Sequence, residues 1–295
     1  MLRVTFAQLR HSARRLISAG LAIAIGAAFV AATLVAGEVL DRASVDALSA
    51  EFGDADLVVE GSQIDTDSAE TIGELEAVAA THGVLTVFLQ VEGGGTRRFV
   101  PITPTATDPT LTRVEITTGT APGHGQIVLT EDLADTLNVE VGDQVPILRT
   151  VRREADDPQD VTFDEVLEHV EVSGLLRAPP TPFAATGVAL GDQRQVLDWA
   201  AEENFEGRAT YERLLVRVGP DVSLADAMDQ VAAVDNRLQV STREEYAQAR
   251  AAELTGGNIL TVIGLAFGAV ALLVAAFVIA NTFAVVVVQR TRTLA

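Results

Sequence analysis

Two long apolar segments that carry no charge constrain the fold of this chain more than any other feature. Residues 16–37 and residues 254–289 contain no Asp, Glu, Arg or Lys and consist mainly of Leu, Ile, Val, Ala, Phe and Gly. As a helix rising about 1.5 Å per residue, the first segment would span roughly 33 Å, close to the hydrocarbon thickness of a bilayer. Core helices of soluble proteins seldom run this far without a charge. We therefore predict two transmembrane helices rather than two buried core helices.

The two apolar segments differ in their flanking residues and in their length. The first follows a basic stretch, as a signal peptide does, but its apolar run exceeds the usual length of about 7–15 residues and no A-x-A cleavage site follows it. An uncleaved anchor is therefore favoured over a cleaved signal peptide. The second segment is longer than a bilayer requires: its apolar body begins near Ile259, after Gly256-Gly257, and ends at Val288. We expect its remainder to be a juxtamembrane stalk.

The distribution of charge predicts how the chain is oriented. The first fifteen residues carry arginines and no acid, and so do the last six; these arginines are Arg3, Arg10, Arg14, Arg15, Arg290 and Arg292. The positive-inside rule places both short flanks in the cytoplasm. Residues 38–253 hold all 41 acidic residues and 15 arginines, a net charge of −26, and are then extracytoplasmic. The prediction depends on the short flanks, because charge in long loops has little influence on topology.

These observations predict a multi-pass protein of the cytoplasmic (inner) membrane. Its chain divides into five parts. They are a cytoplasmic N-terminus (1–15), a first transmembrane helix (16–37), an extracytoplasmic domain (38–253), a second transmembrane helix with its stalk (254–289) and a cytoplasmic stub (290–295).

The pattern of residues 38–253 predicts an α+β domain built from two mixed α/β subdomains between the two membrane helices. Apolar periodicity and turn residues predict helices over 38–52, 66–80, 131–137, 193–203 and 223–234, and strands over 56–60, 84–91, 97–102, 126–129, 145–148, 168–176, 183–190, 214–218 and 238–240. Gly93-Gly94-Gly95 is interpreted as a hairpin turn, and residues 149–164 as a protruding hairpin or loop. Ser241 to Glu244 has the pattern of a capping box that opens a helix leading into the second span. A stalk helix is thus expected at both ends of the domain.

Composition and motifs argue against most kinds of chemistry in this chain. It has no Cys, which excludes disulfides, thiolate zinc sites and a cysteine nucleophile, and no Lys, which excludes a GxxxxGK[ST] phosphate loop. The four histidines, His11, His82, His124 and His169, have no metal-binding spacing. A net charge of −20 argues against nucleic acid as a partner. We predict no catalytic, cofactor-binding or metal-binding residue.

Two acidic patterns are weak candidates for binding a cation. Asp65-x-Asp67 is similar to the start of a calcium loop, but its sixth position is Glu70 rather than Gly. The cluster Glu154, Asp156, Asp157, Asp160, Asp164 and Glu165 could attract a cation, although a solvated loop is the favoured interpretation.

Small residues recur at four-residue spacing in both apolar segments. Gly264 and Gly268 form a GxxxG pattern, and Gly20 and Ala24 have the same spacing. Because small residues let helices approach closely in lipid, they predict a helix-packing interface. The alternative is an Ala- and Gly-rich span without such a role.

Three stretches resemble a known family. Gly125–Ala134 (GQIVLTEDLA), Leu137–Asp143 (LNVEVGD) and Val170–Leu176 (VEVSGLL) resemble, in order, the periplasmic core domain of MacB/FtsX-type ABC transporter permeases. The end, Asn281–Ala295, is similar to the second span of that family where it enters the cytoplasm. The resemblance covers nearly the whole chain.

The resemblance implies a function and partners. Such permeases act as dimers on a separate cytoplasmic ATPase that binds ATP and Mg, and they relay its closure through their helices to the outer domain for export or mechanotransmission. The implied partners are this ATPase subunit, a second permease copy, membrane lipid and an extracytoplasmic protein or small-molecule substrate. Family members normally carry two more spans, so we expect this chain to be a fragment or half of a split permease.

Two other classes compete with this interpretation. A two-span membrane sensor or receptor would bind a ligand with the same outer domain and continue into a signalling helix, whereas a permease would continue into further spans. A membrane-anchored enzyme lacks a recognisable site in this sequence.

Overall fold

The chain folds into two compact units. The computed structural model describes residues 2–112, 114–153, 162–177, 188–204, 206–254 and 259–293. The helix unit consists of Met1–Val45 and Ala249–Ala295, and the globular unit consists of Asp46–Gln248. The globular unit contains helices and strands together, which confirms the predicted mixed α/β fold class.

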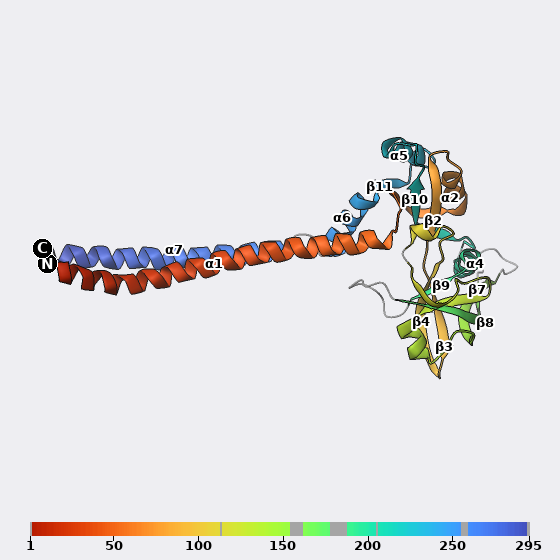
Figure 1. The fold of residues 1–295 in the computed structure, drawn as a ribbon, viewed down its shortest axis with the longest axis horizontal. Helices are drawn as coiled ribbons and strands as arrows, with labels where there is room; N and C mark the ends of the chain where they lie inside the picture. Colours follow the sequence, from red (N-terminus) through yellow and green to blue (C-terminus); the bar gives the residue numbers. More distant parts are fainter. Residues whose placement is uncertain are drawn as a thin grey trace. The chain divides into compact units, whose positions relative to one another are not determined.

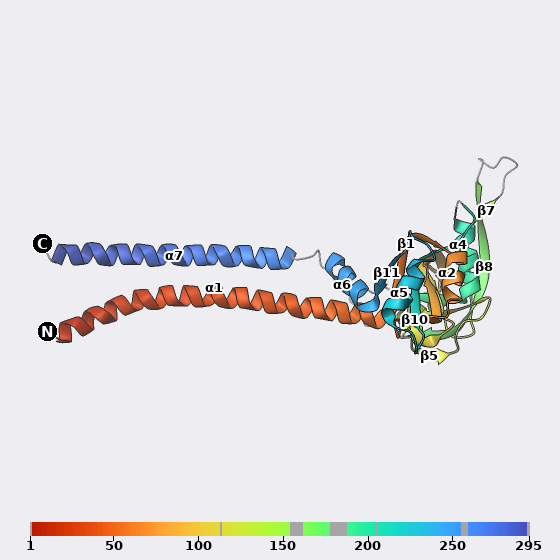
Figure 2. The same cartoon turned by 90° about the horizontal axis from the view of Figure 1, so that it is seen from above.

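Two long antiparallel helices dominate the helix unit. Helix α1 spans Leu2–Glu51 and helix α7 spans Ile259–Thr293. Both views show them side by side, with the start of α1 beside the end of α7 (Figures 1 and 2). The stretches Ala24–Ser49 and Val262–Asn281 are long and apolar enough to cross a membrane, with mean hydropathies of 1.7 and 2.8. The structure thus has a candidate membrane helix toward each end of the chain, as predicted.

Helix α1 is much longer than a membrane span. Its 50 residues correspond to about 75 Å of helix, against a hydrocarbon core of about 30 Å. It continues without interruption to Glu51, which confirms the helix predicted after the first apolar segment. The second helix that leaves the globular unit, α6, spans Arg243–Leu254. Residues 255–258, between α6 and α7, lie outside the described residues.

A four-stranded antiparallel sheet forms one part of the globular unit. Its strand order is β11-β1-β10-β2, with β1 at Leu57–Asp65, β2 at Val78–Val84, β10 at Thr210–Val218 and β11 at Gln239–Thr242. Helix α2 (Thr66–Gly73) connects β1 to β2, and helix α5 (Leu224–Ala232) connects β10 to β11. Strands β1 and β2 both run antiparallel to β10, and strands β10 and β11 both run antiparallel to β1. Each helix therefore joins two parallel strands. This is the split βαβ arrangement.

The rest of the globular unit is a small barrel inserted between β2 and β10. Its strand order is β5-β8-β6-β9-β4-β3-β7, with β3 at Val87–Gly93, β4 at Thr96–Pro104, β5 at Ile116–Gly119, β6 at Gln126–Thr130, β7 at Gln144–Arg153, β8 at Thr162–Leu176 and β9 at Ala189–Gly191. An additional pairing of β7 with β8 closes six of these strands into a ring, and β5 adds to β8 outside it. The connections carry the 3-10 turn η1 (Pro109–Leu111) and the helices α3 (Glu131–Leu137) and α4 (Gln193–Glu203).

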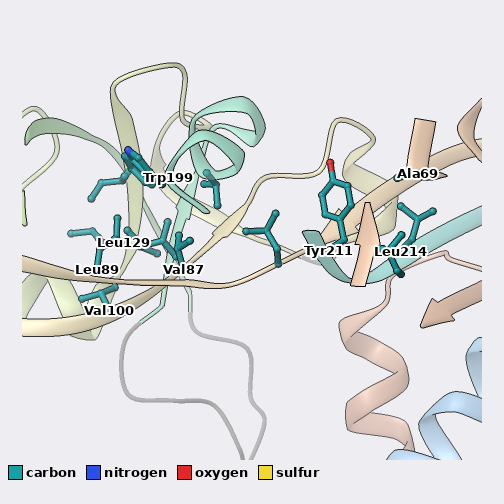
Figure 3. Close-up of a cluster of buried hydrophobic side chains, with 14 of the residues drawn as sticks. Ala69, Val87, Leu89, Val100, Leu129, Trp199, Tyr211 and Leu214 are labelled. Atoms are coloured by element: carbon teal, nitrogen blue, oxygen red, sulfur yellow. The ribbon is translucent and has the colours of Figure 1, made fainter. Parts of the chain in front are cut away.

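One hydrophobic cluster joins the sheet and the barrel. Trp199 of α4 packs among barrel residues such as Leu89 and Leu129, while Leu214 and Tyr211 of β10 belong to the same cluster on the sheet side (Figure 3). Trp199, 3% exposed, is the only tryptophan of the chain. The two parts of the globular unit therefore share a core.

Local signals account for several element boundaries. Asp65 and Ser223 cap α2 and α5 by accepting hydrogen bonds from the backbone N–H groups of Ser68 and Asp226. The turn at Gly93–Gly95 joins β3 and β4, which confirms the predicted hairpin. Gly94 and Gly95 both have positive φ angles, which glycine adopts without strain.

Three predictions about secondary structure were wrong in detail. The helix predicted over 66–80 ends at Gly73, because residues from Val78 onward pair with β10 as strand β2. For the strand predicted over 183–190, residues 183–187 lie outside the described residues, and the described part, strand β9, begins only at Ala189. The capping box before α6 is formed by Thr242 and Glu245, one residue later than predicted.

Candidate functional site

A cluster of polar and aromatic side chains lies where the two stalk helices, α1 and α6, join the four-stranded sheet. We call it the stalk root and define it as Phe52, Gly53, Arg213, Arg243 and Tyr246. Phe52 and Gly53 follow α1, Arg243 and Tyr246 lie in the first turn of α6, and Arg213 lies on β10. The chain thus enters and leaves the globular unit at one place on one sheet.

Aromatic contacts hold the centre of the stalk root. The rings of Phe52 and Tyr246 are 5.3 Å apart and nearly perpendicular, and both side chains are buried. The guanidinium carbon of Arg213 lies 5.9 Å from each ring centroid, and Arg213 donates a hydrogen bond of 3.1 Å to the Tyr246 hydroxyl. Edge-to-face and cation–π contacts of this kind each contribute about 0.5–1.5 kcal/mol beyond simple burial.

Backbone hydrogen bonds fasten both stalk helices to the sheet. The Arg243 guanidinium donates 2.5 Å to the carbonyl of Gly53, and the Arg243 backbone N–H donates 3.0 Å to the carbonyl of Asp56. Asp56 in turn bonds β10, because its N–H donates to the carbonyl of Val216 and its carboxylate accepts from the N–H of Val218. The end of α1 and the start of α6 therefore contact each other directly and share the same strands.

Gly53 is required by the geometry of this junction. Its φ angle is +52°, and a Cβ atom built on it would overlap the carbonyl oxygen of Thr110. That oxygen accepts a hydrogen bond of 2.8 Å from the N–H of Asp54. Glycine thus lets the chain turn sharply out of α1 while it packs against η1.

The stalk root covers one face of the sheet. Phe52 and Tyr246 belong to a second hydrophobic cluster with Val58 and Leu215, on the face opposite α2 and α5. His82 of β2 lies directly opposite Leu215 in the register, between two residues, Ala80 and Val84, that pack against this cluster. It is 4% exposed, its Nδ1 has no hydrogen-bond partner among the described residues, and burial lowers its pKa to about 4.

The helix unit brings small residues of the two long helices together. A Cβ atom built at Gly264 would overlap Thr33, and one built at Gly268 would overlap Val30. Gly26 lies against Ala271 in the same antiparallel contact. The predicted packing residues Gly20 and Ala24 lie elsewhere: a Cβ at Gly20 meets nothing within 4 Å, and Ala24 is exposed. A role for these residues in a membrane stays a prediction.

The six arginines used to predict topology lie at the same end of the helix pair. Arg3, Arg10, Arg14 and Arg15 belong to the first part of α1, and Arg290 and Arg292 to the last part of α7. Because α1 and α7 are antiparallel, all six positions gather at one end (Figure 2).

The candidate cation-binding residues have structural roles or lie outside the described part of the chain. Asp65 caps α2, and the hydrogen bonds from Ser68 lower its pKa. Asp164 forms an ion pair of 2.6 Å with Arg153, while residues 154–161 are not among the described residues. Within the described ranges no cluster of three or more His, Asp or Glu side chains could hold a metal ion.

Sequence analysis missed the stalk root. The first helix was predicted to end at residue 52, but nothing in the sequence connected the next residue, Gly53, with Arg243, 190 residues later. A signal was available, because aromatic residues make up only 5% of the chain and one of them lies beside the domain end of each stalk helix. Aromatic residues at both junctions indicate anchoring to a common core.

Comparison with known proteins gives one family. Residues 19–234 match the family model described as the MacB-like periplasmic core domain. No curated protein matches the sequence.

Three solved structures that match this chain are distant from it in sequence. The periplasmic region of MacB from Actinobacillus actinomycetemcomitans is 10% identical, with a TM-score of 0.48 over 67% of this chain and 93% of that one. The extracellular domain of the noncanonic ABC-type transporter YknZ from Gram-positive bacteria is 10% identical, with a TM-score of 0.44 over 63% and 98%. A domain of a putative permease protein from Porphyromonas gingivalis is 16% identical, with a TM-score of 0.41 over 64% and 88%.

Proposed function

Because this chain belongs to the MacB-like periplasmic core domain family, whose members are components of ABC transporter permeases, we propose that it relays ATP hydrolysis by a separate ATPase subunit to its globular unit. The energy relayed to the globular unit drives export of a substrate or mechanotransmission. ATP and Mg bind the ATPase, and this chain contributes the membrane helices and the outer domain. A second permease copy completes the transporter.

The observation that supports a relay most directly is the attachment of both stalk helices to one sheet. Helix α1 is continuous from its apolar stretch to Glu51, so the helix that would cross the membrane ends directly before Phe52 and Gly53 of the stalk root. There the Gly53 carbonyl accepts a hydrogen bond from Arg243 of α6, and Asp56 is hydrogen-bonded to β10. A shift of α1 relative to α6 would therefore strain these bonds or move the sheet.

The surface of the helix pair supports a place in the membrane. Large apolar side chains of both helices are exposed, including Phe29 and Val35 of α1 and Phe267, Leu273 and Phe277 of α7. Such a surface is stable in lipid and would aggregate in water. With the arginine-bearing end in the cytoplasm, the globular unit lies outside the cell membrane.

Purification from native membranes tests the proposal. We expect an affinity-tagged chain to bring down a subunit with a GxxxxGK[ST] motif, and an ATP analogue to change hydrogen exchange in strands β1 and β10. If no ATPase is recovered and a signalling kinase is recovered instead, the chain is a sensor and the proposal is wrong.

Variants of the stalk root separate coupling from assembly. Arg213→Ala removes the cation that contacts both aromatic rings, so we expect the ATPase to bind as before while the exchange response of β1 and β10 shrinks. Arg250→Ala is the matched control, because its ion pair with Glu253 lies on the exposed surface of α6. An equal response in both variants would show that force does not pass through the stalk root.

A further inference from the structure

A cleft of about 830 Å³ lies between the four-stranded sheet and the barrel. Residues of α2, β2 and β10 form one wall, and the first turn of α4 forms the other. This volume is in the range of clefts that bind small molecules. No residue of the stalk root lines the cleft, so it is separate from the proposed relay.

Two glycines of the sheet-side wall make room for neighbouring side chains of that wall. A Cβ atom built at Gly83 would overlap the ring of Tyr211, so glycine at this position allows the ring to lie against β2. Gly73 faces Thr81, whose hydroxyl would be 3.3 Å from a Cβ there. The Tyr211 hydroxyl points away from the strand that carries it (Figure 3).

Hydrogen bonds fix polar groups on both walls. Gln193 of α4 accepts a hydrogen bond of 3.0 Å from the Thr107 hydroxyl and also hydrogen-bonds the side chain of Tyr211. Burial raises the pKa of Tyr211, so its hydroxyl keeps its proton. Gln193 and Tyr211 therefore present ordered donors and acceptors across the junction of sheet and barrel, as a binding site requires.

Two opposite charges face this cleft from different walls without neutralising each other. Glu70 comes from α2 and Arg194 from α4, and neither forms an ion pair within the described part of the chain. The third charged residue of the lining, Asp192, already accepts the hydrogen bond that caps α4. The cleft thus offers a free carboxylate on one side and a free guanidinium on the other.

The net charge of the segment that contains the cleft restricts which class of ligand the cleft can bind. Residues 38–253 have a net charge of −26, so their field repels anions. A ligand with one amino and one carboxylate group has no net charge and would complement both Glu70 and Arg194. Amide groups between those ends match the hydroxyls and the Gln193 amide of the walls.

We propose that this cleft binds short zwitterionic peptides, with the amino group at Glu70 and the carboxylate at Arg194. The backbone amides of the peptide then contact Gln193 and Tyr211, and its side chains lie near Leu197 and Leu214. The proposal goes beyond the proposed relay and does not depend on it.

Calorimetric titration of the full chain in detergent, without any ATPase, tests this site. The probes are trialanine, N-acetyl-trialanine, trialanine amide and an equimolar mixture of tripeptides. We expect trialanine or the mixture to bind at millimolar or lower concentration, and each capped peptide to bind about tenfold more weakly, which corresponds to roughly 1.4 kcal/mol. Absence of binding by both trialanine and the mixture, or equal binding of capped and free trialanine, would overturn the proposal.

Charge variants assign each end of the peptide. Glu70→Gln should abolish the penalty for acetylating the amino group, and Arg194→Gln should abolish the penalty for amidating the carboxylate. Glu74→Gln and Arg208→Gln are the matched controls, because both residues are exposed and do not line the cleft. If the controls weaken binding as much as the cleft variants, a general charge effect explains the binding and this site is refuted. Failure of binding would leave co-purification with the ATPase unaffected.

Discussion

Acidification should destabilise the globular unit through His82 in particular. Its side chain is 4% exposed on the stalk-root face of the sheet, opposite Leu215, and the neighbouring residues of β10 on that face are Arg213 and Arg217. A protonated imidazole there would be a buried cation beside hydrophobic side chains. The pKa of His82 is accordingly lowered from 6.5 to about 4 by burial.

The magnitude follows from linkage between protonation and folding. Above pH 6.5 the imidazole is neutral in both states and has no effect on the pH dependence of stability. As the pH falls from 6.5 to 4, the unfolded chain binds a proton that the folded chain does not, so stability is lost. At about 1.4 kcal/mol per pKa unit, this amounts to roughly 2 kcal/mol between pH 7.5 and pH 5 and to roughly 3 kcal/mol below pH 4.

Urea unfolding of the full chain in detergent measures this loss. Trp199 is the only tryptophan and belongs to the cluster that joins sheet and barrel, so its fluorescence reports on the globular unit. His82→Leu removes the titrating group, and we expect it to lose about 2 kcal/mol less than the wild type between the two pH values. His169→Gln, at an exposed position, should keep the wild-type pH dependence. Parallel losses in the wild type and His82→Leu would refute the reasoning.

Two further predictions concern glycines at close contacts. Gly53→Ala should lower the free energy of unfolding by about 2 kcal/mol or more, because the position has a positive φ angle and a Cβ would overlap Thr110. Gly95→Ala is the control: its φ angle is also positive but a Cβ meets open space, so the same urea titration should show a loss of only about 1 kcal/mol. The chain has no native Cys, so a Val30→Cys, Gly268→Cys double variant should form a disulfide across the helix pair on oxidation. A Val30→Cys, Leu273→Cys control should not, since Leu273 is exposed. Equal cross-linking of the two double variants would contradict the packing of α1 against α7.

The parts of the fold that depend on neighbouring residues were predictable. Long uncharged segments indicated the helix pair, and apolar periodicity with turn residues placed α3, α4 and α5 within one or two residues. The glycine-rich turn between β3 and β4 also follows from local backbone preferences.

The parts that depend on distant pairing were not predictable in the same way. Ala79 and Ala80 favour a helix, yet pairing with β10, more than 130 residues later, makes their segment strand β2. Closure of the barrel requires the 15-residue strand β8 to pair with both β6 and β7, which no local pattern indicates. The spacing of small residues identified candidates for helix packing but did not show which of them face the neighbouring helix.

The position of the barrel within the split βαβ sheet has a consequence for how such chains diversify. The barrel leaves the sheet after β2 and returns at β10, and these two strands are direct neighbours, with Val84 opposite Arg213. The ends of the insertion are therefore close enough for a short hairpin to replace it. Evolution can therefore enlarge, remodel or exchange the insertion while the strands that carry the stalk helices keep their register.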